Sequence, residues 1–288
     1  VVPLVEEIVG YLTIPTTKHQ KAVMLVGEGA NGKSTFLQML TALLREQDVS
    51  RLSLQQLEDS PFSAAELQGK LANVYADIPS SKLEKSDVFK SVVAGDPIKA
   101  ERKFGHPFTL RTTARLIFSA NSFPRSSDTS QAYFRRWIIV PFPNRFEGKG
   151  ADPNLPVKLR EPAVLSALLA RGIAGLRRLE SQGQFSLTKA NELQLETYRA
   201  ECNSAYEFAA DRVRAVENGH VSKAALYEAY CRWCSESGIK YPVNNRAFNH
   251  SLTGQFRDIK EVQDGPKRTK SWEGIEMIGV AQHAEAKY

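Results

Sequence analysis

The sequence lacks long apolar stretches and is poor in cysteine. Its 288 residues contain no run of about 18 apolar residues, the length that a membrane-spanning helix requires, so we expect no membrane partner. The chain does not open with a basic segment followed by an apolar one, which argues against a signal peptide. With only three cysteines, a fold held together by disulfides is disfavoured, and a reducing compartment is expected.

Two of the cysteines, Cys231 and Cys234, have the spacing of a metal-ligand pair. A structural zinc site needs four ligands, and neither a second cysteine pair nor a close pair of histidines accompanies them. Both also fall within an apolar helical pattern. We therefore predict that these cysteines pack in a core rather than bind zinc.

A strong charge imbalance is missing as well. The net charge is +6 and the isoelectric point is near 9.1, which is compatible with a polyanionic partner. The excess is spread over both halves, so any basic surface depends on local placement. The length predicts two domains, and 42% hydrophobic residues suffice for real cores. Because the chain starts without Met inside a helical pattern, we expect a fragment of something longer.

The most informative stretch is residues 27–35, GEGANGKST. It follows the apolar run 22–26 and precedes the helical pattern 36–40, which is the strand-turn-helix context of a nucleotide-binding P-loop. Glycines let backbone N–H groups surround a phosphate, Lys33 reaches the β- and γ-phosphates, and the Ser34 hydroxyl binds Mg²⁺. The predicted nucleotide-binding residues are Gly27, Gly29, Ala30, Asn31, Gly32, Lys33, Ser34 and Thr35.

A carboxylate is expected at the end of a second strand. Residues 71–77, LANVYAD, form a strand candidate that ends in Asp77, and an oxygen ligand at this place suits Mg²⁺. Nucleotide hydrolases usually have a second acid beside the first, but Ile78 follows here. Asp77 then serves both roles, or Asp96 or Glu101 assists it.

Three further segments carry polar groups. Residues 115–121, RLIFSAN, form a strand with the amide of Asn121 at its tip. Residues 96–109 alternate polar and apolar side chains, which predicts a β-hairpin. Its basic and aromatic tip is either a solvated turn or a DNA contact through Lys103, Phe104 and His106. Arg135 and Arg136 precede the apolar strand 137–142; they are surface charges or, in a ring-forming NTPase, reach a neighbouring subunit's nucleotide.

These residues together resemble a family. GEGANGKST, the ADIP strand end, GDPIKAERKFGHPF, LIFSANSFP and FRRWIIVPF occur in the order and spacing of superfamily 3 helicases. The chain most resembles the helicase half of phage and plasmid primase-helicases, a group that includes the poxvirus primase-helicase. The resemblance covers residues 8–146.

The resemblance implies an α/β fold: an AAA+-type P-loop ATPase core with a central, mainly parallel sheet. It also implies roles. Lys33 holds phosphates, Asn121 polarises the attacking water, and Arg135, with Arg136 as its substitute, is the arginine finger supplied in trans. Lys103 and His106 look like the DNA-gripping tip of the hairpin. The implied catalytic residues are Lys33, Asp77, Asn121, Arg135 and Arg136, with Ser34 and Asp77 as Mg²⁺ ligands.

The C-terminal half changes character after a polar break at residues 217–220, which follows the helical patterns 156–180 and 188–216. Helices and then a hairpin with a basic loop are typical of a winged-helix domain. The stretches LYEAYCRWC and SWEGIEMIG resemble the C-terminal domain of the same primase-helicases. The loop either contacts DNA phosphates or is a solvated or protein-docking turn. Its predicted DNA contacts are Lys267, Arg268 and Lys270.

We therefore predict an ATP- and Mg²⁺-dependent DNA helicase that forms a hexameric ring and moves 3′ to 5′ on single-stranded DNA. It would replicate a phage, plasmid or other mobile element, in the cytoplasm of a bacterial host or at a viral replication site. Expected partners are single-stranded and forked DNA, further copies of the chain, and a primase or polymerase. Two alternatives are an ATP-gated initiator that unwinds little and a ring scaffold that recruits a primase or polymerase. The predicted segments are 1–20 (helical), 21–150 (ATPase core), 151–217 (helical) and 218–288 (winged helix).

Overall fold

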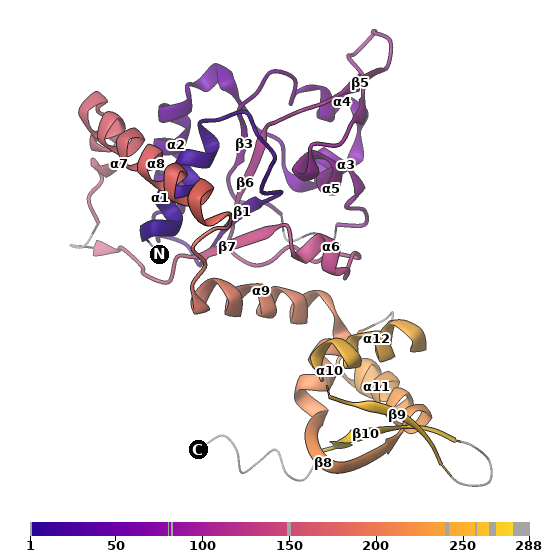
Figure 1. The fold of residues 1–288 in the computed structure, drawn as a ribbon. Coiled ribbons are helices and arrows are strands. Elements are labelled where there is room, and N and C mark those ends of the chain that lie inside the picture. Colours follow the sequence, from indigo (N-terminus) through magenta and orange to yellow (C-terminus); the bar gives the residue numbers. More distant parts are fainter. Residues whose placement is uncertain are drawn as a thin grey trace. The chain divides into compact units, whose positions relative to one another are not determined.

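The structure is a computed structural model that describes residues 2–79, 81, 83–148, 151–239, 242–256, 258–264 and 269–278 (Figure 1). It divides into two compact units, which we call the N-terminal unit (residues 1–198) and the C-terminal unit (residues 199–288). The four segments predicted from the sequence remain a prediction.

The N-terminal unit is built on a five-stranded parallel sheet with the strand order β2-β3-β6-β1-β7. All five residues of β1 and all six of β6 are buried, as expected for strands covered on both faces. This confirms the predicted α/β fold with a central parallel sheet. The strands are β1 (Ala22–Val26), β2 (Val49–Ser50), β3 (Ala72–Tyr75), β6 (Arg115–Ala120) and β7 (Trp137–Pro141).

Helices cover both faces of this sheet. Figure 1 shows α1, α2, α7 and α8 to one side of it and α3, α5 and α6 to the other. The core on the first side joins apolar residues of α1 and α2 with the inner strands. The helices are α1 (Val2–Leu12), α2 (Lys33–Leu44), η1 (Glu46–Asp48), α3 (Leu54–Asp59), α4 (Pro61–Ala65), α5 (Asp87–Ala94), α6 (Gln131–Phe134), α7 (Leu155–Lys158), α8 (Pro162–Gln182) and α9 (Lys189–Cys202).

A separate antiparallel pair forms the predicted hairpin. β4 (Ile98–Ala100) pairs with β5 (Phe108–Leu110), and the connecting tip extends away from the rest of the N-terminal unit in Figure 1. The strands of the pair turn alternate residues inward, so that Ile98, Ala100 and Leu110 are buried while the tip is exposed.

The C-terminal unit combines three helices with a three-stranded antiparallel sheet of order β8-β10-β9. Its core is formed by apolar residues from all three helices and the sheet, among them Phe208, Tyr230, Phe248 and Trp272. The elements in chain order are α10 (Ser204–Arg212), β8 (Val213–Ser222), α11 (Lys223–Glu236), α12 (Asn245–Gln255), β9 (Lys260–Asp264) and β10 (Thr269–Met277).

Strand β8 runs through the predicted polar break at residues 217–220, but its pairing with β10 is interrupted there, since His220 pairs with Glu273 and Ala215 with Ile275. The polar residues of this segment are exposed, and Gly219 lies against the β10 backbone: a Cβ there would be 2.7 Å from the Ile275 carbonyl carbon.

None of the described helices combines the length and apolar character needed to cross a membrane. Cys234 is buried in the core of the C-terminal unit, and Cys231 packs partly buried against it. Among the described residues no group of His, Cys, Asp and Glu could hold a metal ion.

Candidate functional site

Three polar segments meet at one edge of the parallel sheet. Gly27 follows β1, Asn121 follows β6, and Asp77 lies two residues beyond the end of β3. Because β3, β6 and β1 are adjacent and parallel, their carboxyl ends lie at the same edge. This edge is the usual place for a ligand in an open α/β sheet.

The loop 27–32 between β1 and α2 has an unusual backbone. Gly32 has φ of 87° and Ala30 has φ of 58°, both in the left-handed region. At Gly27 a Cβ would lie 2.3 Å from the carbonyl oxygen of Phe142, so only glycine fits there. Successive residues of opposite handedness turn their N–H groups toward one point, which makes an anion-binding concavity at the start of α2.

Lys33 is the first residue of α2 and is only 6% exposed. Its Nζ donates to the carbonyl oxygens of Gly27 and Glu28, to Asn31 Oδ1 (3.0 Å) and to Asn121 Oδ1 (3.1 Å). Burial lowers the pKa of Lys33 below its ordinary 10.5, and the charge of Asp77 opposes this shift. An anionic ligand would stabilise this buried ammonium group, which is surrounded mainly by neutral oxygens.

Asn121 connects Lys33 to Asp77. Its Nδ2 donates to Asp77 Oδ1 at 2.9 Å, while its Oδ1 accepts from Lys33. The backbone of Asp77 has φ of 57°, and its N–H donates to Ser119 Oγ at 3.0 Å. The side chain of Asp77 is thus held in place from the neighbouring strand β6.

Pockets flank the loop on both sides. One of about 310 Å³ lies between α2 and β3, and its polar lining includes Ser34, Arg51 and Arg160. The other, of about 240 Å³, lies beside the end of β7 and is lined by Gly27, Phe142 and other residues. The exposed Ser34 hydroxyl borders the same pocket as Ala76, the neighbour of Asp77, so a hydroxyl and a carboxylate are available for a hard cation such as Mg²⁺.

The predicted helpers of Asp77 lie elsewhere. The charge of Asp96 acts to raise the pKa of Arg136, so Asp96 lies near the arginine pair. The backbone N–H of Glu101 donates to the carbonyl oxygen of Pro61 at the base of the hairpin. Among the described residues neither of them is shown to bond to Asp77, whose carboxylate is held by Asn121.

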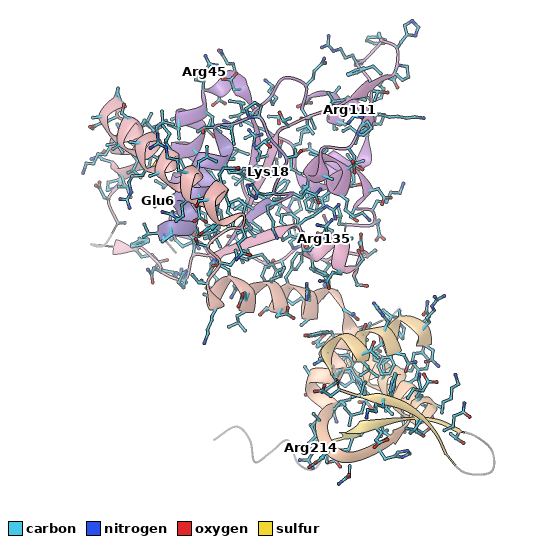
Figure 2. All side chains as sticks on the ribbon, in the orientation of Figure 1. Glu6, Lys18, Arg45, Arg111, Arg135 and Arg214 are labelled. Atoms are coloured by element: carbon cyan, nitrogen blue, oxygen red, sulfur yellow. The ribbon has the colours of Figure 1, made fainter. Side chains whose placement is uncertain are left out.

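Arg135 and Arg136 lie at the opposite edge of the sheet. The backbone of this pair bonds to the residues that begin β1: Arg136 O accepts from Ala22 N at 2.8 Å, and Arg135 O accepts from Lys21 Nζ. The exposed Arg135 side chain (Figure 2) donates to Gln20 Oε1. Arg136 is only 8% exposed. The five residues of β1 separate this edge from the glycine-rich loop by roughly 15 Å.

The hairpin tip exposes all three of its predicted residues. Phe104 is 96% exposed with φ of 64°, and Lys103 Nζ lies 5.3 Å from the centre of its ring. His106 borders a pocket of about 330 Å³ with Arg102, whose Nη2 donates to Gln68 Oε1 at 2.9 Å.

The predicted contacts of the C-terminal hairpin are less defined. Lys267 and Arg268 lie outside the described residues. Lys270, at the start of β10, forms a salt bridge of 3.0 Å with Glu261 of β9.

Sequence reasoning missed several residues of these sites. Ser119 lies inside a mostly apolar strand, and no motif distinguishes it. Gln194 belongs to helix α9, far along the chain, and lines the pocket beside β7. Arg102 stands next to Lys103, and its charge was the one signal that could have included it.

Two family models match the chain, one within the N-terminal unit and one within the C-terminal unit. Residues 25–136 match a family described as "Family of unknown function (DUF5906)", and residues 200–277 match one described as "Poxvirus D5 protein-like". The structure called "The A form apo structure of NrS-1 C terminal region-CTR" is similar with a TM-score of 0.54 and 12% identity, over 92% of this chain and 69% of that one. "The apo structure of NrS-1 C terminal region (305-718)" gives a TM-score of 0.51 and 12% identity, over 92% and 70%.

The fold and the edge-of-sheet site define a class, the α/β proteins with a central parallel sheet, and the NrS-1 C-terminal region shares this fold. The match of residues 200–277 supports the predicted resemblance to the poxvirus-like primase-helicase group, and the two NrS-1 structures share the fold.

Proposed function

We propose that the N-terminal unit is an ATPase with a P-loop at residues 27–35, and that its hydrolysis drives a DNA helicase. The observation that carries the proposal is the hydrogen-bonded chain Lys33–Asn121–Asp77 at the carboxyl edge of the sheet. A phosphate-binding cation, an amide and a metal-binding carboxylate are the groups that phosphoryl transfer to water requires.

ATP and Mg²⁺ fit the residues present. The loop's N–H groups and Lys33 would hold the β- and γ-phosphates, and Ser34 and Asp77 would hold Mg²⁺, which neutralises the charge that develops during transfer. Asn121 would orient the attacking water. The proposed Mg²⁺ ligands lie on the β3 side of the loop. We therefore assign the adenine base of ATP to the pocket on the β7 side, where Phe142 and Gln194 contribute to the lining.

The position of Arg135 supports an assembly of several copies. It is exposed and lies roughly 15 Å from the loop along β1, at the wrong edge of the sheet to serve its own phosphate site. We propose that it enters the site of a neighbouring copy as an arginine finger, within a hexameric ring that moves 3′ to 5′. The buried Arg136 is less available for this role.

We propose that the hairpin tip grips single-stranded DNA. An exposed aromatic ring beside a lysine offers a stacking surface and a phosphate contact, the two elements of sequence-tolerant strand binding. The order α10-β8-α11-α12-β9-β10 supports a winged-helix assignment for the C-terminal unit, in which Lys267, Arg268 and Lys270 would contact DNA phosphates.

One observation favours a second candidate. Asp77 is the one acid bonded to Asn121 among the residues that the structure describes, and the usual second acid of nucleotide hydrolases is replaced by the buried Ile78. Slow turnover would suit an ATP-gated initiator or a ring scaffold that recruits a primase or polymerase rather than a motor.

The test is the Lys33→Ala variant. Removal of the cation should reduce ATP hydrolysis to background, because the transferring phosphates lose their charge partner; phosphate release is measured with and without single-stranded DNA. The matched control is Lys18→Ala, an exposed lysine paired with Glu180. Turnover retained by Lys33→Ala would remove the assignment of the loop. Wild-type protein that binds ATP with turnover near background would favour the initiator and scaffold.

A further inference from the structure

The half-buried Gln20 has an unusual backbone conformation just before β1. Its φ of 50° lies in the left-handed region, which few residues other than glycine, asparagine and aspartate adopt. Of the four other non-glycine residues with positive φ in the described chain, Ala30, Asp77 and Phe104 lie in the sites described above. Strained backbone persists only where the surrounding structure imposes it, and it is concentrated at functional sites. Gln20 is therefore a candidate for a function of its own.

Two neighbouring side chains of this segment hold Arg135. Gln20 Oε1 accepts from both Nη1 (3.3 Å) and Nη2 (3.2 Å) of the Arg135 guanidinium. The Nζ of Lys21 donates to the Arg135 carbonyl oxygen. An exposed arginine without such contacts samples many rotamers, so these bonds restrict both the backbone and the head group of Arg135.

The segment that carries Gln20 is itself anchored. The backbone N–H of Gln20 donates to Thr17 O at 2.8 Å. The side chain of His19 is only 6% exposed, its ring centroid lies 5.6 Å from that of Phe185, and its Nε2 lies 3.1 Å from Glu180 Oε1 in α8. Gln20 therefore presents its amide from a packed turn.

The contact with Gln20 leaves Arg135 able to act on a phosphate. A guanidinium has five N–H donors, and Gln20 takes one from each Nη atom. The edge formed by Nε and Nη2 still offers two parallel donors to a phosphate. Gln20 is also uncharged, so it does not neutralise the arginine. A residue that sequestered Arg135 would be expected to be acidic, because a carboxylate would compete with the phosphate.

We propose that Gln20 is a positioning residue for Arg135 and orients the guanidinium that reaches the nucleotide of a neighbouring copy. The inference rests on the proposed role of Arg135 as an arginine finger, and it adds the residue that aims this finger. The head group contributes to hydrolysis only if it is in place when the transition state forms, and a misplacement of about 1 Å can cost about 100-fold in rate.

The experiment measures steady-state ATP hydrolysis by the full chain carrying Gln20→Met, which keeps the length of the side chain and removes the acceptor. The kcat should fall about tenfold or more while the KM for ATP changes less than about twofold, because the arginine acts on the transition state rather than on binding. The matched control is Gln47→Met, at an exposed glutamine of η1, which should hydrolyse ATP like wild type. Mass measurement checks that each variant assembles like wild type.

A double variant tests whether Gln20 acts through Arg135. Gln20→Met combined with Arg135→Ala should be no slower than Arg135→Ala alone, since no guanidinium is left to orient. A merely structural role of Gln20 would slow the double variant further.

Gln20→Gly separates orientation from folding. Glycine adopts the left-handed backbone without strain, so this variant should melt at or above the temperature of wild type. Its kcat should still fall about tenfold, because the acceptor for Arg135 is missing.

Three results would overturn the role of Gln20. These are an unchanged or raised kcat in Gln20→Met, a double variant slower than Arg135→Ala, and a loss of activity in Gln20→Gly that is accompanied by a lower melting temperature. The arginine finger is tested separately by Arg135→Ala. If that variant hydrolyses ATP like wild type, the finger fails and the role of Gln20 with it; if it is slow while Gln20→Met is not, only the role of Gln20 fails.

Discussion

Asp128 is a hydrogen-bonded acid whose charge acts on Arg136 of the arginine pair. Its carboxylate accepts from Lys90 Nζ (2.8 Å), from Ser86 Oγ and from the backbone N–H of Ser130 (2.9 Å). Burial raises its pKa, but these bonds outweigh burial and hold the pKa at about 2. Because Ser130 caps α6, which leads to Arg135, the network fixes the segment that presents the arginine.

We predict that Asp128→Asn destabilises the protein by about 2 kcal/mol at pH 7. The folded pKa of about 2 lies below the ordinary 3.8, so the stabilisation is complete above pH 3.8 and is lost as the pH falls from there toward 2. Urea unfolding of wild type and variant over this pH range measures the effect, and the two curves should converge in acid.

The control is Asp152→Asn, which removes an exposed carboxylate paired with Lys158. Surface pairs contribute little, so its unfolding should match that of wild type. A difference between Asp128→Asn and wild type that stays constant from pH 7 to 2 would contradict the assignment.

Among the elements, α1 and α8 approach each other unusually closely. A Cβ on Gly175 would lie 2.4 Å from the Glu6 carbonyl carbon, and one on Gly10 would lie 2.1 Å from the Gly172 carbonyl oxygen. The buried Glu7 carboxylate completes the contact, since it accepts from Arg178 Nε at 2.7 Å and from Ser186 N at 2.7 Å. Helix α1 is thereby joined to α8, far from it in the sequence.

We predict that Gly175→Ala lowers stability by about 1–3 kcal/mol, because the added methyl group meets backbone that has no room to move. Thermal unfolding followed by circular dichroism would measure the loss. The matched control is Gly254→Ala in α12, where a Cβ meets nothing within 4 Å, and its melting temperature should stay the same or rise. Equal unfolding of the two variants would refute the close packing.

The elements also show what the sequence could predict. Strands such as 22–26 and 115–120 were predictable because both faces are buried and their residues are mostly apolar. The spacing around the loop 27–35 likewise predicted a strand before it and a helix after it, which are β1 and α2. Contacts between segments distant in the sequence left no local pattern: Gln194 from α9 and Arg160 beyond α7 reach the pockets beside the loop only through the fold.

At the scale of the whole molecule, the residues proposed for ATP hydrolysis lie at two opposite edges of the sheet. Lys33, Asn121 and Asp77 lie at the carboxyl edge, and Arg135 lies at the other. A single copy therefore cannot bring the arginine to its own phosphate site. The proposed activity depends on assembly.

We predict that Arg135→Ala spares ATP binding and slows hydrolysis about 1,000-fold or more, since a finger acts only on the transition state. Mixing Arg135→Ala with Lys33→Ala subunits should restore part of the activity, because some interfaces then combine an intact loop with an intact arginine. Phosphate release from the mixture measures this.

Arg177→Ala, at an exposed position of α8, is the control and should hydrolyse ATP like wild type. The mixing result is interpreted only after mass measurement shows that the two variants form mixed assemblies. Absence of rescue in such mixtures would argue against an arginine that acts in trans.

Strand β1 joins the two edges. At its start the Ala22 N–H donates to Arg136 O and the side-chain Nζ of the preceding Lys21 donates to Arg135 O, and the strand ends at Val26, just before Gly27. All five of its residues are buried and paired on both sides, so the strand can move only as a rigid piece. In the proposed ring, a shift of the loop upon nucleotide binding would displace the arginine that serves the next subunit. Successive sites would therefore hydrolyse ATP in sequence around the ring rather than independently.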